Sequence, residues 1–443
     1  MSTGDAGADG MTSWEKRYGK YSDIEANYAN RPGINWQDEA LGRTALTQNY
    51  RVAVSGKTEK MNYSLAYSFY NEEGAMVYSG TKKHNISFNM NHEVNKWLTV
   101  NSRISYDQRR VEGMGTSGDS DRFNKMQHIL QYRPTIGIQG TDAELLAGED
   151  PILADDSGNV MQNPLISAAE EINDREWRTF QANGGATIKL LKGLSFRSTV
   201  GMLYQTRRND VFYGAESQTA KRSSIKGTIT NLENNSFQTS NVLTYAWNNK
   251  IHDITAMVGH EFISKWARSF SAGATQFPND EIGLGDLSLG TPSTPTSSEN
   301  YDDKLLSFFA RVNYSLLDKY LFTASVRADG SSKFGKNNKW GYFPAFSAAW
   351  RLSEEKFIKN LNVFSDLKLR VGYGLAGNNR IDSYQSLAIM SSVTAANGNG
   401  AQAGYASNQV PTPDLKWEAN KTFNLGMDFG FLNQRVTFSP EFY

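Results

Sequence analysis

Adjacent acidic residues are the first candidates for chemistry in this sequence, because general acid and general base catalysis is often carried out by carboxyl groups. They occur as Glu72-Glu73, Asp302-Asp303 and Glu354-Glu355. Each pair lies near the end of a predicted strand, where successive side chains point to opposite faces. Two such carboxylates cannot act on one substrate, and so we interpret these pairs as solvated turn residues.

A second candidate is Ser55-Gly56-Lys57-Thr58, which resembles the end of a phosphate-binding loop. That motif requires a glycine at the position of Arg51 and a helix after the threonine. The residues that follow alternate in polarity as a strand does. We therefore predict a hairpin turn at 57–60 in place of a nucleotide site.

The histidines are scattered along the chain, and none has the spacing of a metal-binding cluster. They are His84, His92, His128, His252 and His260. The sequence contains no cysteine and no Gly-x-Ser-x-Gly motif, which excludes thiolate chemistry and a serine nucleophile elbow. We predict no catalytic residue, no metal site and no enzymatic activity.

Two Asp-rich segments carry the oxygen ligands that Ca²⁺ prefers, Gly118-Asp119-Ser120-Asp121 and Asp155-Asp156-Ser157-Gly158-Asn159. Neither has the full spacing of a calcium-binding loop with its distal Glu, and Asp, Asn and Gly also form turns. We predict no cofactor and keep Ca²⁺ in these segments as a second hypothesis.

Composition excludes several classes of protein. The balance of 46 Lys and Arg against 46 Asp and Glu argues against a nucleic-acid binder. No apolar run approaches the roughly 20 residues of a membrane helix, and segment 1–14 lacks the features of a signal peptide. Aromatic residues reach 12% although the mean hydropathy is −0.54. This mixture is typical of a membrane β-barrel, whose strands face lipid on one side and water on the other.

Apolar and polar residues alternate with the period of two that predicts half-buried strands. In one such segment, Tyr63, Leu65 and Tyr67 alternate with Ser64 and Ala66. The pattern predicts about fourteen strands, most of 10 residues or more, at 47–56, 61–71, 83–93, 97–108, 176–190, 194–205, 236–247, 251–264, 303–315, 319–329, 341–351, 364–374, 420–430 and 434–443.

Short and long connections alternate between these strands, as in an antiparallel membrane barrel with short periplasmic turns and long external loops. The short turns are predicted at 57–60, 94–96, 191–193, 248–250, 316–318 and 431–433, with a longer one at 352–363. The long connections are predicted at 109–175, 206–235, 265–302 and 375–418. Trp97, Trp247, Trp350, Tyr106 and Tyr314 lie near strand ends, where an aromatic girdle is expected. Segment 1–46 shows no alternation, and we interpret it as a loop that precedes the strands.

Several segments resemble SusC/RagA-type TonB-dependent outer-membrane transporters. Segment 30–39 (NRPGINWQDE), followed by 43–45 and 48–49, is similar to the early barrel region of that family. The same holds for 319–357, which contains KYLFTASVRADGSSKFG and WGYFPAFSAAWRLSEEKF, for 367–378 and for 415–443. The resemblance covers nearly the whole chain.

The resemblance implies a 22-stranded barrel with an N-terminal plug, driven by the TonB complex in the outer membrane of Bacteroidetes-like bacteria. It also implies a SusD-like surface lipoprotein as partner and oligosaccharide, or peptide, as cargo. Signal peptide, plug and TonB box are not in the sequence. We interpret the chain as an internal barrel fragment, with 47–443 forming the barrel portion, one strand expected upstream and about seven downstream.

No residue is assigned to substrate, although Tyr213, Tyr301, Tyr384 and Tyr405 lie in predicted loops or near strand ends, where their rings could stack on sugars. Two other readings stay open. A soluble β-rich carbohydrate-binding or adhesin module is the main alternative, and an outer-membrane hydrolase is the other. The alternating connection lengths and the long strands favour the transporter.

Overall fold

The computed structural model describes residues 12–113, 125–138, 140–147, 163–293, 297–396 and 401–443, and one antiparallel sheet dominates it. In the main path of this sheet each strand pairs with the next. The strands of the path are β1 (Thr47–Lys57), β2 (Met61–Glu73), β3 (Gly80–Glu93), β4 (Leu98–Glu112), β5 (Glu171–Leu191), β6 (Leu194–Tyr213), β7 (Lys226–Asn248), β8 (His252–Thr275), β10 (Ser297–Leu316), β11 (Tyr320–Ser331), β12 (Trp340–Arg351), β13 (Phe364–Asn378), β16 (Glu418–Phe431) and β17 (Val436–Phe438).

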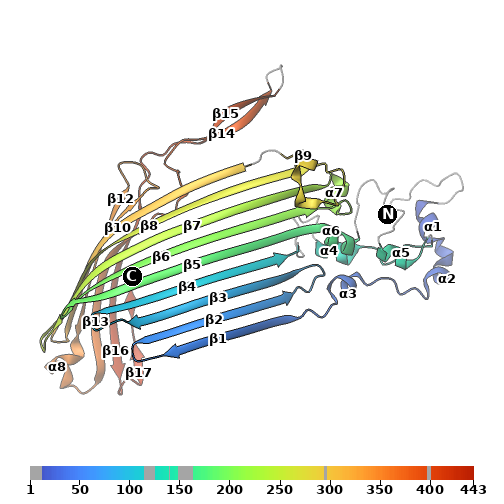
Figure 1. Ribbon diagram of the computed structural model, residues 1–443. Coiled ribbons are helices and arrows are strands. Elements are labelled where there is room, and N and C mark those ends of the chain that lie inside the picture. Colours follow the sequence, from blue (N-terminus) through green and yellow to red (C-terminus); the bar gives the residue numbers. More distant parts are fainter. Residues whose placement is uncertain (1–11, 114–124, 139, 148–162, 294–296, 397–400) are drawn as a thin grey trace.

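The sheet curves, so that β12, β13, β16 and β17 lie behind the strands that precede them (Figure 1). It is open, because β1 and β17 are at the two ends of the path. Two short strands lie off the path: β9 (Thr291–Pro292) pairs with β8, and β18 (Glu441–Phe442) pairs with β16. The all-β antiparallel sheet agrees with the predicted partial barrel.

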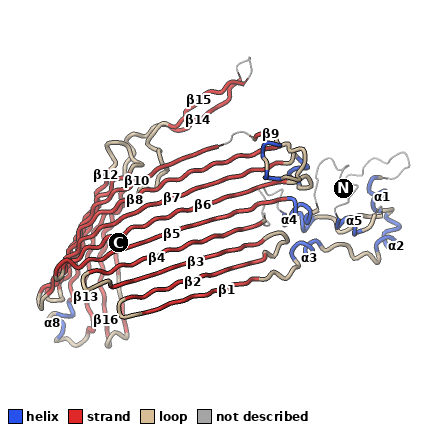
Figure 2. Tube along the Cα trace, in the orientation of Figure 1, coloured by secondary structure: helices blue, strands red, loops and turns tan. Residues whose placement is uncertain are grey.

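Each of the predicted strands overlaps one strand of the path, or β17 and β18 in the case of 434–443. The last prediction was wrong in detail, because this segment is broken at Pro440, which has no N–H to donate to a ladder. The predicted short turns are also present, including 58–60, 192–193 and 249–251. They lie at one end of the strands, and the long connections lie at the other (Figure 2).

The strands from β5 to β10 are longer than predicted, with 21, 20, 23 and 24 residues in β5, β6, β7 and β8. The predicted loop 206–235 is therefore wrong: only 214–225 connects β6 to β7. Its polar residues continue the ladder, as in the pairs of Arg208 with Asn231 and Asp210 with Ile229. Apolar and polar residues alternate only in the part of a strand that has one apolar face. The alternation therefore ends before the strand ends, and the predicted strands were too short.

Segment 1–46 is not a plain loop, and this prediction was wrong for the part that the structure describes. It contains α1 (Ser13–Tyr18), η1 (Tyr21–Asp23), α2 (Ile24–Tyr28) and α3 (Trp36–Leu41). Thr12 and Glu15 form a reciprocal capping box at the start of α1. Asn35 caps α3 by accepting the N–H of Gln37 at 3.2 Å. Helices of one or two turns leave too short a pattern for periodicity to detect.

The same segment anchors the long connection between β4 and β5, which contains α4 (Lys125–Gln131), α5 (Asp142–Ala147) and α6 (Pro164–Glu170). Trp36 is 3% exposed, packs edge-on against Tyr132 at 5.0 Å, and donates its indole N–H to the Arg133 carbonyl at 2.8 Å. Ile129, Ile136 and Leu145 complete a small core. These helices lie at the long-loop end of the sheet (Figure 1).

Other connections also contain structure that the sequence did not predict. The connection between β13 and β16 carries a separate hairpin, β14 (Ile389–Ala396) with β15 (Ala401–Gln409). Helix α7 (Gln218–Arg222) lies between β6 and β7, η3 (Gly283–Gly285) and η4 (Leu287–Leu289) lie between β8 and β9, and η5 (Leu352–Glu354) and α8 (Lys356–Lys359) lie in the turn after β12. Within the residues described, no helix is long and apolar enough to cross a membrane.

Candidate functional site: the two faces of the sheet

Strand register assigns every residue of the sheet to one of two faces, because directly opposed residues on neighbouring strands share a face. One such row on β7, β8, β10 and β11 is Leu243, Val258, Ala310 and Val326. Val258 is 55% exposed and Val326 is 46% exposed. We call this the outer face. Apolar side chains are exposed along it across the sheet, as in the row Val52, Tyr67, Ile86, Tyr106, Phe180 and Tyr204.

A row of aromatic rings borders the outer face at the short-turn end. Trp247, His252, Tyr314 and Phe322 follow one another with ring centroids 6.2, 6.0 and 6.3 Å apart. Tyr320, on the same strand as Phe322, stacks on Trp350 of β12 with ring centroids 6.0 Å apart. Trp247, Tyr314 and Trp350 therefore lie where the girdle was predicted. Such a row is typical of the boundary between hydrocarbon and water.

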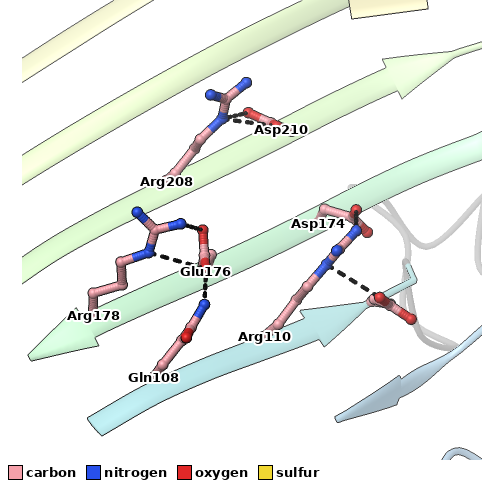
Figure 3. Close-up of polar contacts among 8 residues, drawn as sticks. Gln108, Arg110, Asp174, Glu176, Arg178, Arg208 and Asp210 are labelled. Carbon is pink, nitrogen blue, oxygen red and sulfur yellow. Dashed lines mark hydrogen bonds and ion pairs between the residues drawn. The ribbon is translucent and has the colours of Figure 1, made fainter. Parts of the chain in front are cut away.

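Toward the long-loop end the outer face is charged, and polar side chains of neighbouring strands contact one another there (Figure 3). Gln108 and Arg110 continue the face of Tyr106 on β4. Gln108 donates to Glu176 at 2.5 Å, and Arg110 binds Asp174 at 2.6 Å. Arg178 binds Glu176 at 2.9 Å, and Arg208 binds Asp210 at 2.8 Å. These ion pairs are exposed and individually weak. The apolar band therefore ends on the short-turn side of these ion pairs.

The opposite face, which we call the inner wall, is polar along most of its length. On β11 the Arg327 guanidinium donates to Glu261 at 2.9 Å, to Ser307 at 2.8 Å and to Asp329 at 2.7 Å. Ser307 is fully buried and Asp329 is 8% exposed. Farther along the wall, Arg370 forms two bonds of 2.9 Å to Asp428. Such forked contacts fix both partners in one geometry.

A further part of the inner wall combines tryptophan and arginine. Trp177 on β5 is directly opposite Arg109 on β4 and Arg207 on β6. The two guanidinium carbons lie 5.4 and 5.3 Å from its ring centroid, within cation–π range. One row toward the short-turn end, Gln205 donates to Thr179 at 3.3 Å and accepts from Asn234 at 3.4 Å. This wall presents charge, hydrogen-bonding groups and a flat ring to a polar ligand.

The sequence did not identify Arg109, Trp177 and Arg207 as a group, because two of them fell in predicted loops. A usable pattern was present: Arg103, Ser105, Asp107 and Arg109 follow the period of two without interruption. Extending that alternation past the last apolar residue would have assigned Arg109 to the inner wall.

The four tyrosines singled out in the sequence do not form one site. Tyr213 ends β6, with the Lys226 ammonium 5.0 Å from its ring. The hydroxyl of Tyr384 accepts the N–H of Asp302, which brings it near Tyr301, and this contact is structural. Tyr405 lies on β15 and is 78% exposed. The structure assigns none of them to substrate.

The other chemical candidates are also located. Glu354 and Glu355 bind Lys359 and Lys319, and Ser55-Gly56-Lys57-Thr58 spans the end of β1 and its hairpin turn. His84, His252 and His260 hydrogen-bond with Tyr67, Tyr314 and Asn241. Among the described residues no group of three or more His, Asp or Glu could hold a metal ion. The two calcium candidates, 118–121 and 155–159, lie outside the described residues.

At the outer rim, two carboxyl groups face one another between α6 and the connection after β8. Burial and the neighbouring Asp280 raise the pKa of Glu170. Asp280 accepts the N–H of Ala215 at 2.8 Å, and this bond lowers the pKa of Asp280. Of the two carboxyl groups, Glu170 is therefore the one that binds a proton more readily.

A family model described as TonB dependent receptor-like, β-barrel, matches residues 147–443. The chain belongs to this family of TonB-dependent receptor barrels.

Relatives of known sequence and structure agree with the family. The TonB-dependent receptor P3 of Formosa agariphila is 27% identical over 442 residues, covering 98% of this chain and 43% of that protein. The TonB-dependent receptor SusC of Bacteroides thetaiotaomicron is 28% identical over 469 residues, covering 97% of this chain and 45% of that protein. The RagAB peptide importer in its closed-closed state superposes with a TM-score of 0.75 at 23% identity, over 96% of this chain and 48% of that chain.

The chain thus spans less than half the length of these relatives, and the superposition shows a shared fold. TonB-dependent receptor barrels are bacterial outer-membrane proteins and are not enzymes, which confirms the predicted location and the prediction of no enzymatic activity. The apolar outer face therefore lies against lipid, and the short turns are on the periplasmic side.

Glu355 lies in the periplasmic turn after β12, and we expect its hydrogen bonds to make the stability of the protein sensitive to acid. It accepts from Tyr320 at 2.8 Å, Lys319 at 3.0 Å and Trp350 at 3.2 Å, and these bonds lower its pKa. A lowered pKa means that the unfolded chain binds the proton more readily. The stabilisation is therefore complete at neutral pH and is lost as the pH falls below the ordinary value of 4.5.

We expect Glu355→Gln to reduce this pH dependence. Urea unfolding of the full-length protein in vesicles at pH 7 and pH 4 measures it. The unaltered protein should lose more stability than the variant on acidification. An equal loss in both proteins would show that Glu355 does not titrate as inferred.

Proposed function

We propose that the full-length protein imports oligosaccharides or peptides across the outer membrane, driven by TonB, together with a SusD-like surface lipoprotein. The two-faced sheet carries the proposal. Its apolar outer face requires lipid, and its polar inner wall requires water or a polar ligand on the other side. The similarity to the TonB-dependent receptor SusC and to the RagAB peptide importer supports TonB-driven import, with peptide as one of the two cargo classes.

The rim supports the part of the proposal that concerns a lipoprotein partner. Helices α3, α4 and α6 are packed into a core around Trp36, and Arg31 donates to the carbonyls of Gly137 and Gly140. These packed helices give the external end of the sheet a folded surface, to which we expect the lipoprotein to bind. A soluble carbohydrate-binding or adhesin module, the alternative raised by the sequence, does not account for the apolar outer face.

The test is uptake by cells that carry or lack the full-length gene. We expect fluorescent oligosaccharides or peptides to accumulate only in cells with the gene, and a protonophore or loss of TonB to abolish the accumulation. Affinity purification from the membrane should recover a surface lipoprotein. Accumulation that is unchanged without TonB would contradict the proposal.

A further inference from the structure

Charge is sorted by face on β4, β5, β6 and β7. By register, the inner wall of these strands carries cations along its length: Arg103, Arg109, Arg175, Lys189, Arg197, Arg207 and Lys226. Five of the seven acidic residues of the same strands lie on the outer face: Glu112, Asp174, Glu176, Asp210 and Glu233. Two carboxylates fall on the inner wall. Asp107 binds Lys83 at 3.0 Å, and Glu171, at the start of β5, is buried beside Ser167.

Among the residues that the structure describes, the inner-wall cations near the external end of these strands have no acidic partner. Within the described residues, Arg109 and Arg207 form no hydrogen bond or ion pair, and each makes its one recorded contact with the Trp177 ring. Arg175, one row farther out, has a buried Nε without a hydrogen-bond partner among those residues. Stacking on the indole holds the two guanidinium planes in place while their N–H groups stay available. The arginines of the outer face differ, because Arg110, Arg178 and Arg208 are all paired.

The cations form a track from the periplasmic end to the external end of the wall. Arg197 lies near the start of β6, Arg103 and Arg109 follow on β4, and Arg175 and Lys226 lie at or near the external ends of β5 and β7. At roughly 3.3 Å per residue, the stretch from Leu191 to Trp177 covers about 45 Å of strand. With a tilt of about 45° this rises roughly 30 Å, above an apolar band about 25 Å tall. The Trp177 cluster therefore lies near the external mouth.

We propose that this inner wall binds the negatively charged groups of the cargo, carboxylates or sulfates carried on an oligomer. The proposal rests on the proposed import function and specifies its cargo class. Arg109, Arg175 and Arg207 form no ion pair among the described residues, and like charges held close together repel one another. An anionic ligand relieves this repulsion. Guanidinium groups bind carboxylate and sulfate through parallel hydrogen bonds.

The test measures binding to the purified full-length protein with matched probes. One pair is a hexameric oligogalacturonate and its fully methyl-esterified, neutral form. A second pair is hexaglutamate and hexaglutamine. Calorimetry or fluorescence anisotropy at low and high salt gives the dissociation constants. We expect an acidic probe to bind at least about tenfold more tightly than its neutral partner, and the difference to shrink as salt screens the charges. The two pairs distinguish an acidic sugar from an acidic peptide.

Two variants on β6 form a matched comparison. Arg207→Gln removes a cation from the inner wall, and Arg208→Gln removes its neighbour from the outer face. We expect R207Q to weaken binding of the acidic probe by about tenfold and to reduce its salt dependence, and R208Q to leave both unchanged. Circular dichroism and heat-modifiability check that both variants fold.

Equal binding of acidic and neutral probes overturns the proposal, as does failure of every acidic probe to bind the unaltered protein. An equal effect of R207Q and R208Q also overturns it. If R207Q lowers stability without cargo and leaves acidic-probe binding intact, the arginines serve another part of the protein, and the proposal again fails. TonB-dependent uptake of neutral probes would keep the import function while rejecting the anionic cargo.

Discussion

Replacing Val258 with arginine is expected to destabilise the barrel in the membrane strongly. Val258 lies on the outer face of β8, 55% exposed, in the row of Leu243, Ala310 and Val326. A lipid-facing arginine near the bilayer midplane costs about 2–4 kcal/mol. Urea titration of the full-length protein folded into vesicles measures the loss. On gels, the heat-modifiable folded band should weaken.

Thr255→Arg is the matched control. Thr255 lies three residues away on the same strand, and register with Ala246 and Asn313 places it on the inner wall. There an arginine faces a polar surface, and we expect a change below about 0.5 kcal/mol. If both variants lose the same stability, or if V258R folds normally, the assignment of the two faces is wrong.

The sheet could be predicted from the sequence because lipid and water impose opposite demands on alternate residues. Where a strand has one apolar face, as at Tyr63, Leu65 and Tyr67, its period and position were correct. Where both faces of a strand are polar, as at Arg207 to Asp210 of β6, the strand continues although the alternation that predicts it has ended. The predicted strands therefore end where the apolar band ends. The strand ends beyond the membrane were missed because neither of their faces is apolar.

The helical rim could not be predicted from periodicity, because its stability comes from contacts between distant segments. Trp36 is buried in a core that includes Met76 and Tyr132, and Tyr132 is nearly a hundred positions away. The segment that contains Trp36 was recognised by resemblance and interpreted as a loop. Its role in holding the connection between β4 and β5 appears only when both segments are folded together.

The inner wall was partly accessible from sequence. Alternation places Arg103 opposite the apolar face of β4, and it places Arg327 and Asp329 on one face of β11. What the sequence could not show is which strands become neighbours in register. Trp177 on β5 contacts Arg109 on β4 and Arg207 on β6, so that this cluster joins three strands. Arg327 on β11 contacts Glu261 on β8, across the intervening strand β10. Pairing across strands therefore carries information that a single strand lacks.

Replacing Arg327 with methionine is the second substitution expected to have a large effect. The change removes the donor shared by Glu261, Ser307 and Asp329, and it leaves the nearly buried Asp329 carboxylate without its 2.7 Å partner. Breaking a buried ion pair costs about 3–5 kcal/mol. Because the Arg327 side chain is 38% exposed, we expect about 1–3 kcal/mol, measured by urea unfolding in vesicles.

Two comparisons separate this network from a general effect of losing an arginine. Arg311→Met, on the inner wall of β10, removes a cation that has no hydrogen bond or ion pair among the described residues, and should change stability by less than about 0.5 kcal/mol. Adding Glu261→Gln and Asp329→Asn to R327M should recover most of the loss, because no uncompensated charge then remains. If R311M is as costly as R327M, or if the triple variant is less stable than R327M, the guanidinium is not what holds β8, β10 and β11 together on this wall.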